Sequence, residues 1–423
     1  MNTAPPRNIV VVGGGVQGTS VAYQLCKSSS LPPQSTITIL ESKAPASAAS
    51  GKGGGFMARS WGDGSPTQSL HHLAFDMYET LAQELQCDSY RKLPVLSVSP
   101  GYTNPTKRLQ RDNPTLAALI PKWLDGNVGR MSAMGYGDDT AQITPAEFVN
   151  KMLEDKKDNI NVILGTCTGV ETEQGSERGS RKIVGVKYTP REEEGEEQMI
   201  PADAVIVSAG PWSCAAEDWF QGALELPMEG VKSTSIVWKK PESGEDGDEG
   251  DVDATALFCG EDDRFGTHLE VYPRPDGTIY ICGIGGSEYI STSSLKSGAF
   301  REECNANPSR VDAASQSFQE MSKVYKERGE LDKVQACMRP CPPDAMPYMG
   351  KVPGFEGAFI NAGHNCWGIA WAPACGKAIS ELVLDGESTS INLAPFNPAR
   401  FTPVTGRGGR GRKRRGDSVG EQW

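Results

Sequence analysis

The sequence lacks the features that mark membrane, metal-binding and disulfide-stabilised proteins. No apolar run in its 423 residues reaches the length of a membrane span. Its four histidines show neither HxxxH nor HxH spacing, and its eleven cysteines include no CxxC pair. We therefore expect no metal site, and we expect the cysteines to be reduced thiols in a cytoplasmic protein. We also expect no signal or transit segment, because a strand pattern begins about eight residues from the start.

The charge is unevenly distributed along the chain. The formal net charge is −12, but residues 407–423 carry six basic and two acidic groups, so the remainder carries −16. An acidic body argues against nucleic acid as its main ligand. Residues 242–253 hold seven acids and predict a disordered surface insertion, and residues 403–423 predict a disordered Gly/Arg-rich tail. Three interpretations of residues 406–416 within that tail are open: a solvated segment, an RNA contact or a nuclear import signal.

Residues 8–18 form the most informative motif. A β-branched run is followed by Gly13, Gly15 and Gly18 in GxGxxG spacing and then by a helical pattern. In such a unit the first glycine permits a tight turn, the second lets the backbone approach a pyrophosphate, and the third lets the helix pack on the strand. The next strand pattern ends at Glu41, 23 residues past Gly18, where a carboxylate can bind a ribose 2′-OH. Together these features predict a dinucleotide site.

The rest of the chain alternates between helical and strand patterns. It predicts helices over residues 67–86, 309–328 and 372–384, and strands over residues 36–40, 161–165, 204–208, 231–238, 268–284 and 358–361. Thr144, Pro145 and Glu147 predict another helix start with a capping box. Residues 47–64 show no periodicity beyond a turn. This order predicts an α/β protein in which a mostly antiparallel excursion interrupts a parallel sheet, with the cofactor between the two regions.

Five blocks in order give the chain a family resemblance. They cover residues 12–19, 50–56, 209–213, 338–351 and 361–386. On these blocks the chain resembles, over residues 7–398, the D-amino-acid oxidase, glycine oxidase and sarcosine oxidase family of FAD-dependent oxidoreductases. The wording Gly-His-Asn-Cys-Trp-Gly-Ile in the last block most resembles a poorly characterised eukaryotic branch of fungi, algae and plants.

The resemblance implies a glycine-oxidase-like α/β fold. A Rossmann-like FAD-binding domain with a parallel sheet would be interleaved with a mostly antiparallel substrate domain. The FAD-binding domain would comprise residues 1–64, 141–212 and 344–402, and the substrate domain residues 65–140 and 213–343.

The resemblance also implies FAD as the cofactor instead of NAD. The loop 50–55 would wrap the pyrophosphate and the flavin ring, and residues 363–369 would place a positive helix N-terminus at the flavin N1/O2 edge. The implied cofactor-binding residues are Gly13, Gly15, Val16, Gln17, Gly18, Glu41, Ser42, Ser50, Gly51, Lys52, Gly53, Gly54, Gly55, Cys167, Gly210, Cys337, Gly363, His364, Cys366, Trp367, Gly368 and Ile369.

Two neighbouring residues carry the catalytic hypotheses. Arg339 lies where glycine oxidases have an arginine that clamps the substrate carboxylate, a bidentate task that suits a guanidinium; the alternative is an ordinary ion pair. Cys337 aligns with the cysteine that sarcosine oxidases bond to the flavin 8α carbon, yet Arg339 accompanies noncovalent FAD in glycine oxidases. We expect noncovalent FAD, with covalent linkage as the alternative.

Three further residues are expected near the substrate. Arg59 lies one residue away from a carboxylate-binding arginine of sarcosine oxidases. His268 and Tyr272, with Glu270 between them, alternate along one strand and face either the substrate pocket or solvent. We expect Cys341 and Cys366 to be packed thiols, and His364 to contact the flavin through its backbone.

The resulting hypothesis is an FAD-dependent amine or amino-acid oxidase. It would oxidise the C–N bond of a small carboxylated amine, such as a glycine derivative, an N-methyl amino acid or a D-amino acid, by hydride transfer to flavin N5, with oxygen as electron acceptor. Two alternatives remain open. One is a dehydrogenase that uses a quinone or a carrier protein, and the other is a regulatory flavoprotein linked to endosomes. We expect a cytoplasmic location, with endosome association or nuclear import through the basic tail as further alternatives.

Overall fold

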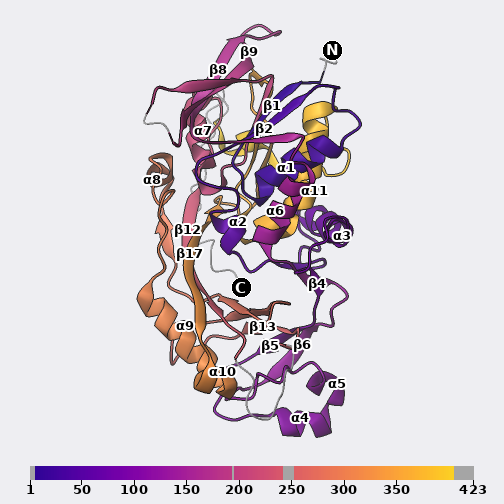
Figure 1. Cartoon of the computed structure of the whole chain (residues 1–423), viewed down its shortest axis with the longest axis vertical. Coiled ribbons are helices and arrows are strands. Elements are labelled where there is room, and N and C mark those ends of the chain that lie inside the picture. Colours follow the sequence, from indigo (N-terminus) through magenta and orange to yellow (C-terminus); the bar gives the residue numbers. More distant parts are fainter. Residues whose placement is uncertain (1–4, 193–194, 242–251, 404–423) are drawn as a thin grey trace.

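Two large β-sheets organise the molecule. The computed structural model describes residues 5–192, 195–241 and 252–403. A nine-stranded sheet lies in the upper part of Figure 1, and an eight-stranded sheet extends into the lower part. The predicted insertion, apart from its last two residues, and the predicted tail, apart from Pro403, lie outside the described residues. No helix within the described ranges is long and apolar enough to cross a membrane.

The nine-stranded sheet is built around a parallel core. In spatial order the parallel strands are β8 (Ile160–Gln174), β2 (Thr36–Glu41), β1 (Asn8–Val12), β11 (Ala204–Val207) and β20 (Ala358–Ala362). β9 (Arg181–Pro190), β10 (Gln198–Pro201) and β18 (Tyr348–Lys351) extend it in antiparallel pairs, and β19 (Phe355–Glu356) runs parallel to β9. Consecutive apolar residues in β1 serve both faces of the sheet, because Ile9 and Val11 enter one hydrophobic core while Val10 and Val12 enter another.

Helices cover both faces of this sheet. On one face lie α1 (Val16–Lys27), α3 (Gln68–Glu84), α6 (Pro145–Asp155) and α11 (Gly368–Leu384), which gather together in Figure 1. On the other face lie η1 (Gly210–Ala215) and α7 (Ala216–Trp219). The division into an FAD-binding and a substrate domain stays a prediction. The helix α3 falls in the range predicted for the substrate domain, but its apolar side chains pack in the same hydrophobic core as those of α1 and α11.

The eight-stranded sheet is mostly antiparallel, as expected. Its order is β16 (Glu288–Ile290), β12 (Glu229–Trp238), β15 (Ile279–Cys282), β14 (Glu270–Pro273), β13 (Ala256–Cys259), β5 (Val95–Val98) and β6 (Met131–Gly135), with β17 (Leu331–Cys341) paired to β12. Only the pairing of β13 with β5 is parallel within the described part of this sheet. The predicted strand pair at 268–284 is the hairpin β14–β15. Around this sheet lie α4 (Thr106–Asp112), α5 (Pro114–Ala117), α8 (Thr292–Lys296), α9 (Pro308–Met321) and α10 (Lys323–Arg328).

Short elements complete the described chain. A third sheet contains β3 (Phe56–Ala58), β7 (Thr140–Gln142) and β4 (Arg91–Lys92), and the remaining helices are α2 (Ala49–Lys52), η2 (Asn365–Trp367), η3 (Ala394–Phe396) and η4 (Pro398–Phe401). The segment 47–64 therefore holds a helix and a strand, where its composition predicts neither. Both are too short, at four and three residues, to show a period.

Two predictions about helix ends are wrong. The helix expected over 309–328 is two helices, because Ser322 is extended (φ −136°, ψ 112°) and its side chain accepts a hydrogen bond from the Tyr325 amide. The capping box of α6 does not form, since the Thr144 side chain makes no capping bond. The Glu147 carboxylate accepts hydrogen bonds from the backbone amides of Asp88 and Ser89 instead, at 2.9 and 3.0 Å.

Candidate cofactor and substrate site

A cavity of about 540 Å³ lies between the two large sheets. The carboxyl ends of β1, β2, β11 and β20 line one part, and β14, β15 and β17 line another. We call the part around residues 13–18, Glu41 and 50–55 the glycine end. We call the part around Ser233, Glu270, Tyr272, Cys282 and Arg339 the arginine end.

The glycine end begins at a turn that only glycines allow. Gly13 has φ +110°, and a Cβ placed there would lie 2.5 Å from the Ser208 carbonyl oxygen. A Cβ on Gly18 would lie 1.9 Å from the Gly13 carbonyl oxygen. The two glycines therefore let α1 start directly against the ends of β1 and β11, so that the helix N-terminus opens towards the cavity.

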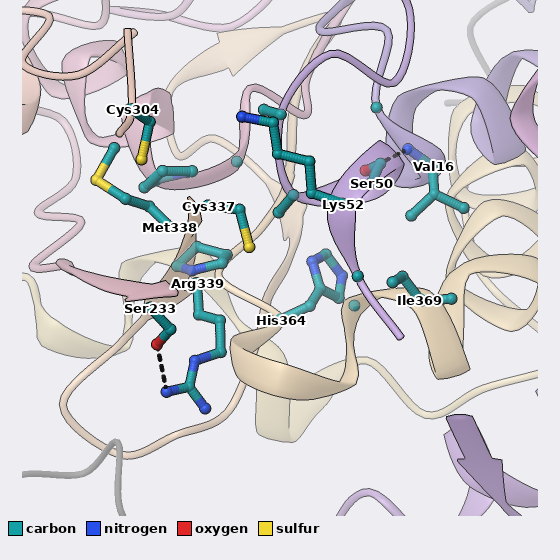
Figure 2. Close-up of a pocket in the computed structure, with 18 of the residues that line it drawn as sticks. Val16, Ser50, Lys52, Ser233, Cys304, Cys337, Met338, Arg339, His364 and Ile369 are labelled. Carbon is teal, nitrogen blue, oxygen red and sulfur yellow. Dashed lines mark hydrogen bonds between the residues drawn. The ribbon is translucent and has the colours of Figure 1, made fainter. Parts of the chain in front are cut away.

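Two polar side chains fix the backbone around this turn. The Glu41 carboxylate accepts hydrogen bonds from the amides of Gly14 and Lys43, at 2.7 and 2.9 Å. The Ser50 hydroxyl accepts a hydrogen bond of 2.9 Å from the Val16 amide at the start of α1, and this bond is drawn in Figure 2. Glu41 thus stands at the end of β2 as predicted, with its carboxylate held beside the glycine loop.

The loop 50–55 extends from the glycine end towards the strands of the arginine end. Lys52 Nζ donates to the Ala336 carbonyl oxygen at 3.0 Å, which joins the loop to β17. A Cβ on Gly53 would lie 2.5 Å from the Ile369 side chain, and one on Gly54 would lie 2.5 Å from the Tyr272 ring. The glycines therefore allow the loop to lie between the start of α11 and the β14 wall.

The start of α11 forms another wall. Gln17 donates to the Gly368 carbonyl oxygen at 2.6 Å and accepts from the Asn361 amide at 3.1 Å, so α1 and α11 are tied together. No side chain caps the helix at Trp367. His364 lies in the preceding loop, where burial lowers its pKa to about 3 and keeps the imidazole neutral.

Arg339 dominates the arginine end. Its Nη2 donates to the Ser233 hydroxyl at 3.0 Å, as Figure 2 shows, while its Nε is buried without a hydrogen-bond partner in the described part of the chain. Cys337 lies two residues before it on β17 and therefore on the same face of the strand. Burial raises the pKa of the Cys337 thiol to about 11.

The hairpin β14–β15 supplies the facing side chains of the arginine end. Its register places Glu270 opposite Cys282 and Tyr272 opposite Tyr280. The Tyr272 hydroxyl and the Cys282 thiol both donate to Oε2 of Glu270, the thiol at 3.5 Å. Phe56 stacks on the Tyr272 ring with 5.4 Å between centroids, so aromatic faces border the charged groups.

The structure brings most of the predicted site residues to this one cavity. The lining includes Gly13, Gly15, Val16, Gln17, Glu41, Ser42, Ser50, Lys52, Gly53, Gly54, Gly55, Cys167, Gly210, His268, Tyr272, Cys337, Arg339, His364, Cys366, Trp367, Gly368 and Ile369. Gly18, Gly51 and Gly363 are outside the lining, and the close contacts of Gly18 and Gly51 are to backbone carbonyls. Their roles towards a cofactor stay predictions.

Two predicted residues lie differently from what we expected. Arg59 is not part of the lining; its guanidinium pairs with the Asp76 carboxylate at 3.0 Å near the surface. Cys341 is buried as predicted, and its thiol donates to Asn365 at 3.0 Å. The prediction that Cys366 is a packed thiol is wrong, because this residue is exposed. Cys366 lies in the short η2 turn and lines the cavity.

The cavity also contains residues that sequence reasoning missed. Ser233, Tyr280, Cys282 and Asn361 line it; the first three belong to no recognisable motif, and Asn361 begins the last of the five sequence blocks. Tyr280 and Cys282 carry a usable signal, since the predicted hairpin pairs their strand with that of Tyr272. Ser233 has no such signal, because only the pairing of β12 with β17 brings it to Arg339.

Comparisons with known proteins agree with this geometry. Residues 8–382 match the model of the family described as "DAO: FAD dependent oxidoreductase". A Schizosaccharomyces pombe protein described as an oxidoreductase is 28% identical over 93% of this chain and 98% of its own length. Glycine oxidase of Pseudomonas aeruginosa is 25% identical over 92% of this chain and 98% of its own length. The crystal structure of glycine oxidase from Geobacillus kaustophilus superimposes with a TM-score of 0.67 at 16% identity, covering 94% of this chain and 99% of that one.

The residues of the cavity suit the cofactor that this family uses. The backbone at Gly13 and Gly18 leaves no room for a Cβ, and α11 presents a helix N-terminus without a side-chain cap. Five buried polar atoms of lining residues have no hydrogen-bond partner in the described chain: Ser208 Oγ, Arg301 Nε, Arg339 Nε, Asn361 Oδ1 and His364 Nε2. A group bound in the cavity would supply partners for such atoms. The chain belongs to the DAO family of FAD-dependent oxidoreductases, enzymes of the amino-acid oxidase type, and FAD is its cofactor.

Proposed function

We propose that this enzyme oxidises the C–N bond of a small amine or amino acid that carries a carboxylate, and that oxygen receives the electrons. The observation that carries the proposal is Arg339. Its guanidinium lines the cavity, its Nε is buried without a partner in the described chain, and its one recorded hydrogen bond goes to a neutral hydroxyl. A buried guanidinium whose charge no neighbouring carboxylate pairs directly is suited to a carboxylate ligand.

The cofactor would be held mainly by the glycine end. The N-terminus of α1 and the loop 50–55 would bind the pyrophosphate, and Glu41 the adenosine ribose. The N-terminus of α11 would stabilise negative charge on the reduced flavin. When bound, FAD supplies the acceptor for the hydride that leaves the substrate carbon.

The protein's own task is then positioning and exclusion of water. Arg339 would fix the substrate carboxylate through a bidentate contact, and the rings of Phe56, Tyr272 and Tyr280 would border the amine with apolar faces. Burial raises the pKa of Tyr272 well above its ordinary value, so its hydroxyl stays protonated and acts only as a hydrogen-bond donor. Holding the reactants in one geometry lowers the barrier without an acid–base pair.

The substrate class follows from the size and chemistry of the site. Glycine derivatives, N-methyl amino acids and D-amino acids all carry a carboxylate on the α-carbon that is bonded to the amine nitrogen. The names of the relatives, glycine oxidase and peroxisomal sarcosine oxidase, support this class and support oxygen as the acceptor.

Anaerobic mixing of the purified holoenzyme with a panel of such amines tests the proposal. Bleaching of the flavin band by a carboxylated amine, and not by the same amine without its carboxylate, is the expected result. Readmission of oxygen should restore the band within seconds; restoration only by a quinone would identify a dehydrogenase. Absence of bleaching by every amine would contradict catalysis and favour the regulatory flavoprotein.

A further inference from the structure

The arginine end holds two opposite charges that do not pair with each other. Arg339 comes from β17 and Glu270 from β14, and β12 and β15 lie between these strands in the sheet. Both side chains line the cavity. Among the described residues, Arg339 makes its recorded hydrogen bond to Ser233, and Glu270 accepts its own from Tyr272 and Cys282. The cavity is therefore dipolar across this end.

Glu270 keeps one oxygen available. Both recorded donors reach Oε2, and no hydrogen bond to Oε1 is recorded within the described chain. Burial raises the pKa values of Tyr272 and Cys282, and the Glu270 carboxylate raises them further, so both groups keep their protons and donate. Two donors fixed on Oε2 leave Oε1 as an acceptor of a group that enters the cavity.

Arg339 offers the complementary position. Its Nε is buried and unpartnered in the described chain. Burial would lower the pKa of Arg339, but the negative charges that Cys366 and Cys341 carry when ionised, and that of the Glu270 carboxylate, raise it overall. A ligand with a carboxylate at one point and a cation at another would satisfy Nε of Arg339 and Oε1 of Glu270 together.

We propose that Glu270 binds a second cationic group of the substrate, so that the preferred substrate is an amino acid with a positively charged side chain. This inference rests on the function proposed above. The reacting amine is not the partner of Glu270, because a hydride leaves from the carbon next to a neutral amine and a contacting carboxylate would hold that amine protonated. A side-chain ammonium stays charged throughout the reaction. An anionic side chain would be repelled by the same carboxylate.

Three amino acids of similar length test the charge preference. Lysine, norleucine and 2-aminoadipate end in a cation, a methyl group and an anion, and each is used as both enantiomers and as its N-methyl derivative. In anaerobic stopped-flow reduction of the holoenzyme, the efficiency should fall in that order. In Glu270→Gln the efficiency of flavin reduction by lysine, divided by that for 2-aminoadipate, should drop about 100-fold. About tenfold of this drop should come from slower reduction by lysine and about tenfold from faster reduction by 2-aminoadipate. Glu270→Asp should keep the order, and the exposed control Glu261→Gln should keep the full ratio.

A binding measurement separates recognition from turnover. Calorimetric titration of the holoenzyme with 5-aminopentanoate, hexanoate and adipate uses the same three end groups without an α-amine. The wild type should bind 5-aminopentanoate at least about tenfold more tightly than adipate, and Glu270→Gln should lose that preference. Two results would overturn the role of Glu270. One is equal binding of the three ligands by the wild type, and the other is a lysine to 2-aminoadipate efficiency ratio in Glu270→Gln that stays within threefold of the wild-type ratio. Failure of every amine to reduce the flavin would overturn the proposed function instead.

Discussion

The glycine end and the arginine end of the cavity are built from different parts of the polypeptide. At the glycine end the backbone itself forms the site: the turn at Gly13, the start of α1 and the loop 50–55 approach closely because side chains are missing. At the arginine end the backbone is an ordinary antiparallel sheet, and long side chains from β14 and β17 reach into the cavity. The glycine end depends on the absence of side chains, and the arginine end depends on charged side chains held at fixed positions.

This difference decides how each end tolerates change. Backbone that touches backbone cannot relax around an added carbon, so a side chain added at Gly13 or Gly18 disturbs the fold and the cofactor together. A side chain that projects into an open cavity can be replaced by one of similar size with little effect on the sheet behind it. Substitutions at the arginine end should therefore leave the fold and the cofactor in place, whereas an added side chain at Gly13 or Gly18 should not.

Gly18→Val should have the largest effect. Its Cβ would lie 1.9 Å from the Gly13 carbonyl oxygen, so α1 must move away from β1. We expect a loss of about 4 kcal/mol of unfolding free energy and no FAD retained on gel filtration. Gly169→Ala is the matched control, because nothing lies within 4 Å of a Cβ there. Full flavin content in Gly18→Val would show that the glycine end is not a backbone-built site.

Arg339→Lys should affect only the arginine end. Lysine keeps the charge but loses the two-point contact, which costs about 2–5 kcal/mol, or roughly thirty- to several-thousand-fold in the efficiency of flavin reduction. Flavin content should be unchanged. Arg59→Lys is the control, since Arg59 pairs with Asp76 outside the cavity lining and should keep wild-type kinetics. Equal reduction rates in wild type and Arg339→Lys would remove the carboxylate clamp.

The two ends also differ in how well the sequence predicts them. The glycine end is local in sequence: Gly13, Gly15 and Gly18 adjoin one strand and one helix, and Glu41 ends the next strand. The arginine end joins residues more than 100 positions apart, such as Ser233 and Arg339, and their contact exists only through the pairing of β12 with β17. The sequence patterns predict the strand β12 but not β17, and they do not give the register in which the two strands pair.

The predicted capping box at the start of α6 was wrong for a similar reason, because a contact distant in sequence decided the outcome. The Glu147 carboxylate could serve the start of its own helix or the amides of a neighbouring segment, and the tertiary contact to Asp88 and Ser89 prevailed. The predicted placement of Arg59 rested on alignment alone, and the pairing with Asp76 on α3 takes its side chain away from the cavity.

Glu41→Ala should have a smaller effect at the glycine end. It removes an acceptor of the Gly14 and Lys43 amides as well as the proposed ribose contact. We expect FAD to bind about 10- to 150-fold more weakly, equivalent to about 1.5–3 kcal/mol, with the reduction rate of the remaining holoenzyme unchanged. Titration of apoprotein followed by flavin fluorescence measures this, with Glu84→Ala as a surface control. An unchanged dissociation constant would place the ribose elsewhere.

Cys337→Ala should have the smallest effect, although Cys337 lies beside Arg339 on β17. Only a thiolate attacks the flavin 8α carbon readily, and burial raises the pKa of this thiol to about 11. The raised value keeps the thiol protonated at neutral pH, and the thiolate becomes abundant only as the pH approaches 11. We therefore expect acid precipitation of the wild-type protein to release all of its yellow colour into the supernatant.

The Cys337→Ala variant tests whether the glycine end alone holds the FAD or the arginine end also holds it. If FAD is held by the glycine end alone, Cys337→Ala keeps the same flavin content and the same complete release by acid. Incubation of the apoprotein with FAD at rising pH sharpens the test. A bond between Cys337 and the flavin that forms only near the pKa of the thiol would show that Cys337 is well placed to react but is protonated at neutral pH. Colour that stays with the wild-type precipitate at neutral pH, and leaves it in Cys337→Ala, would mean that the arginine end also anchors the cofactor covalently.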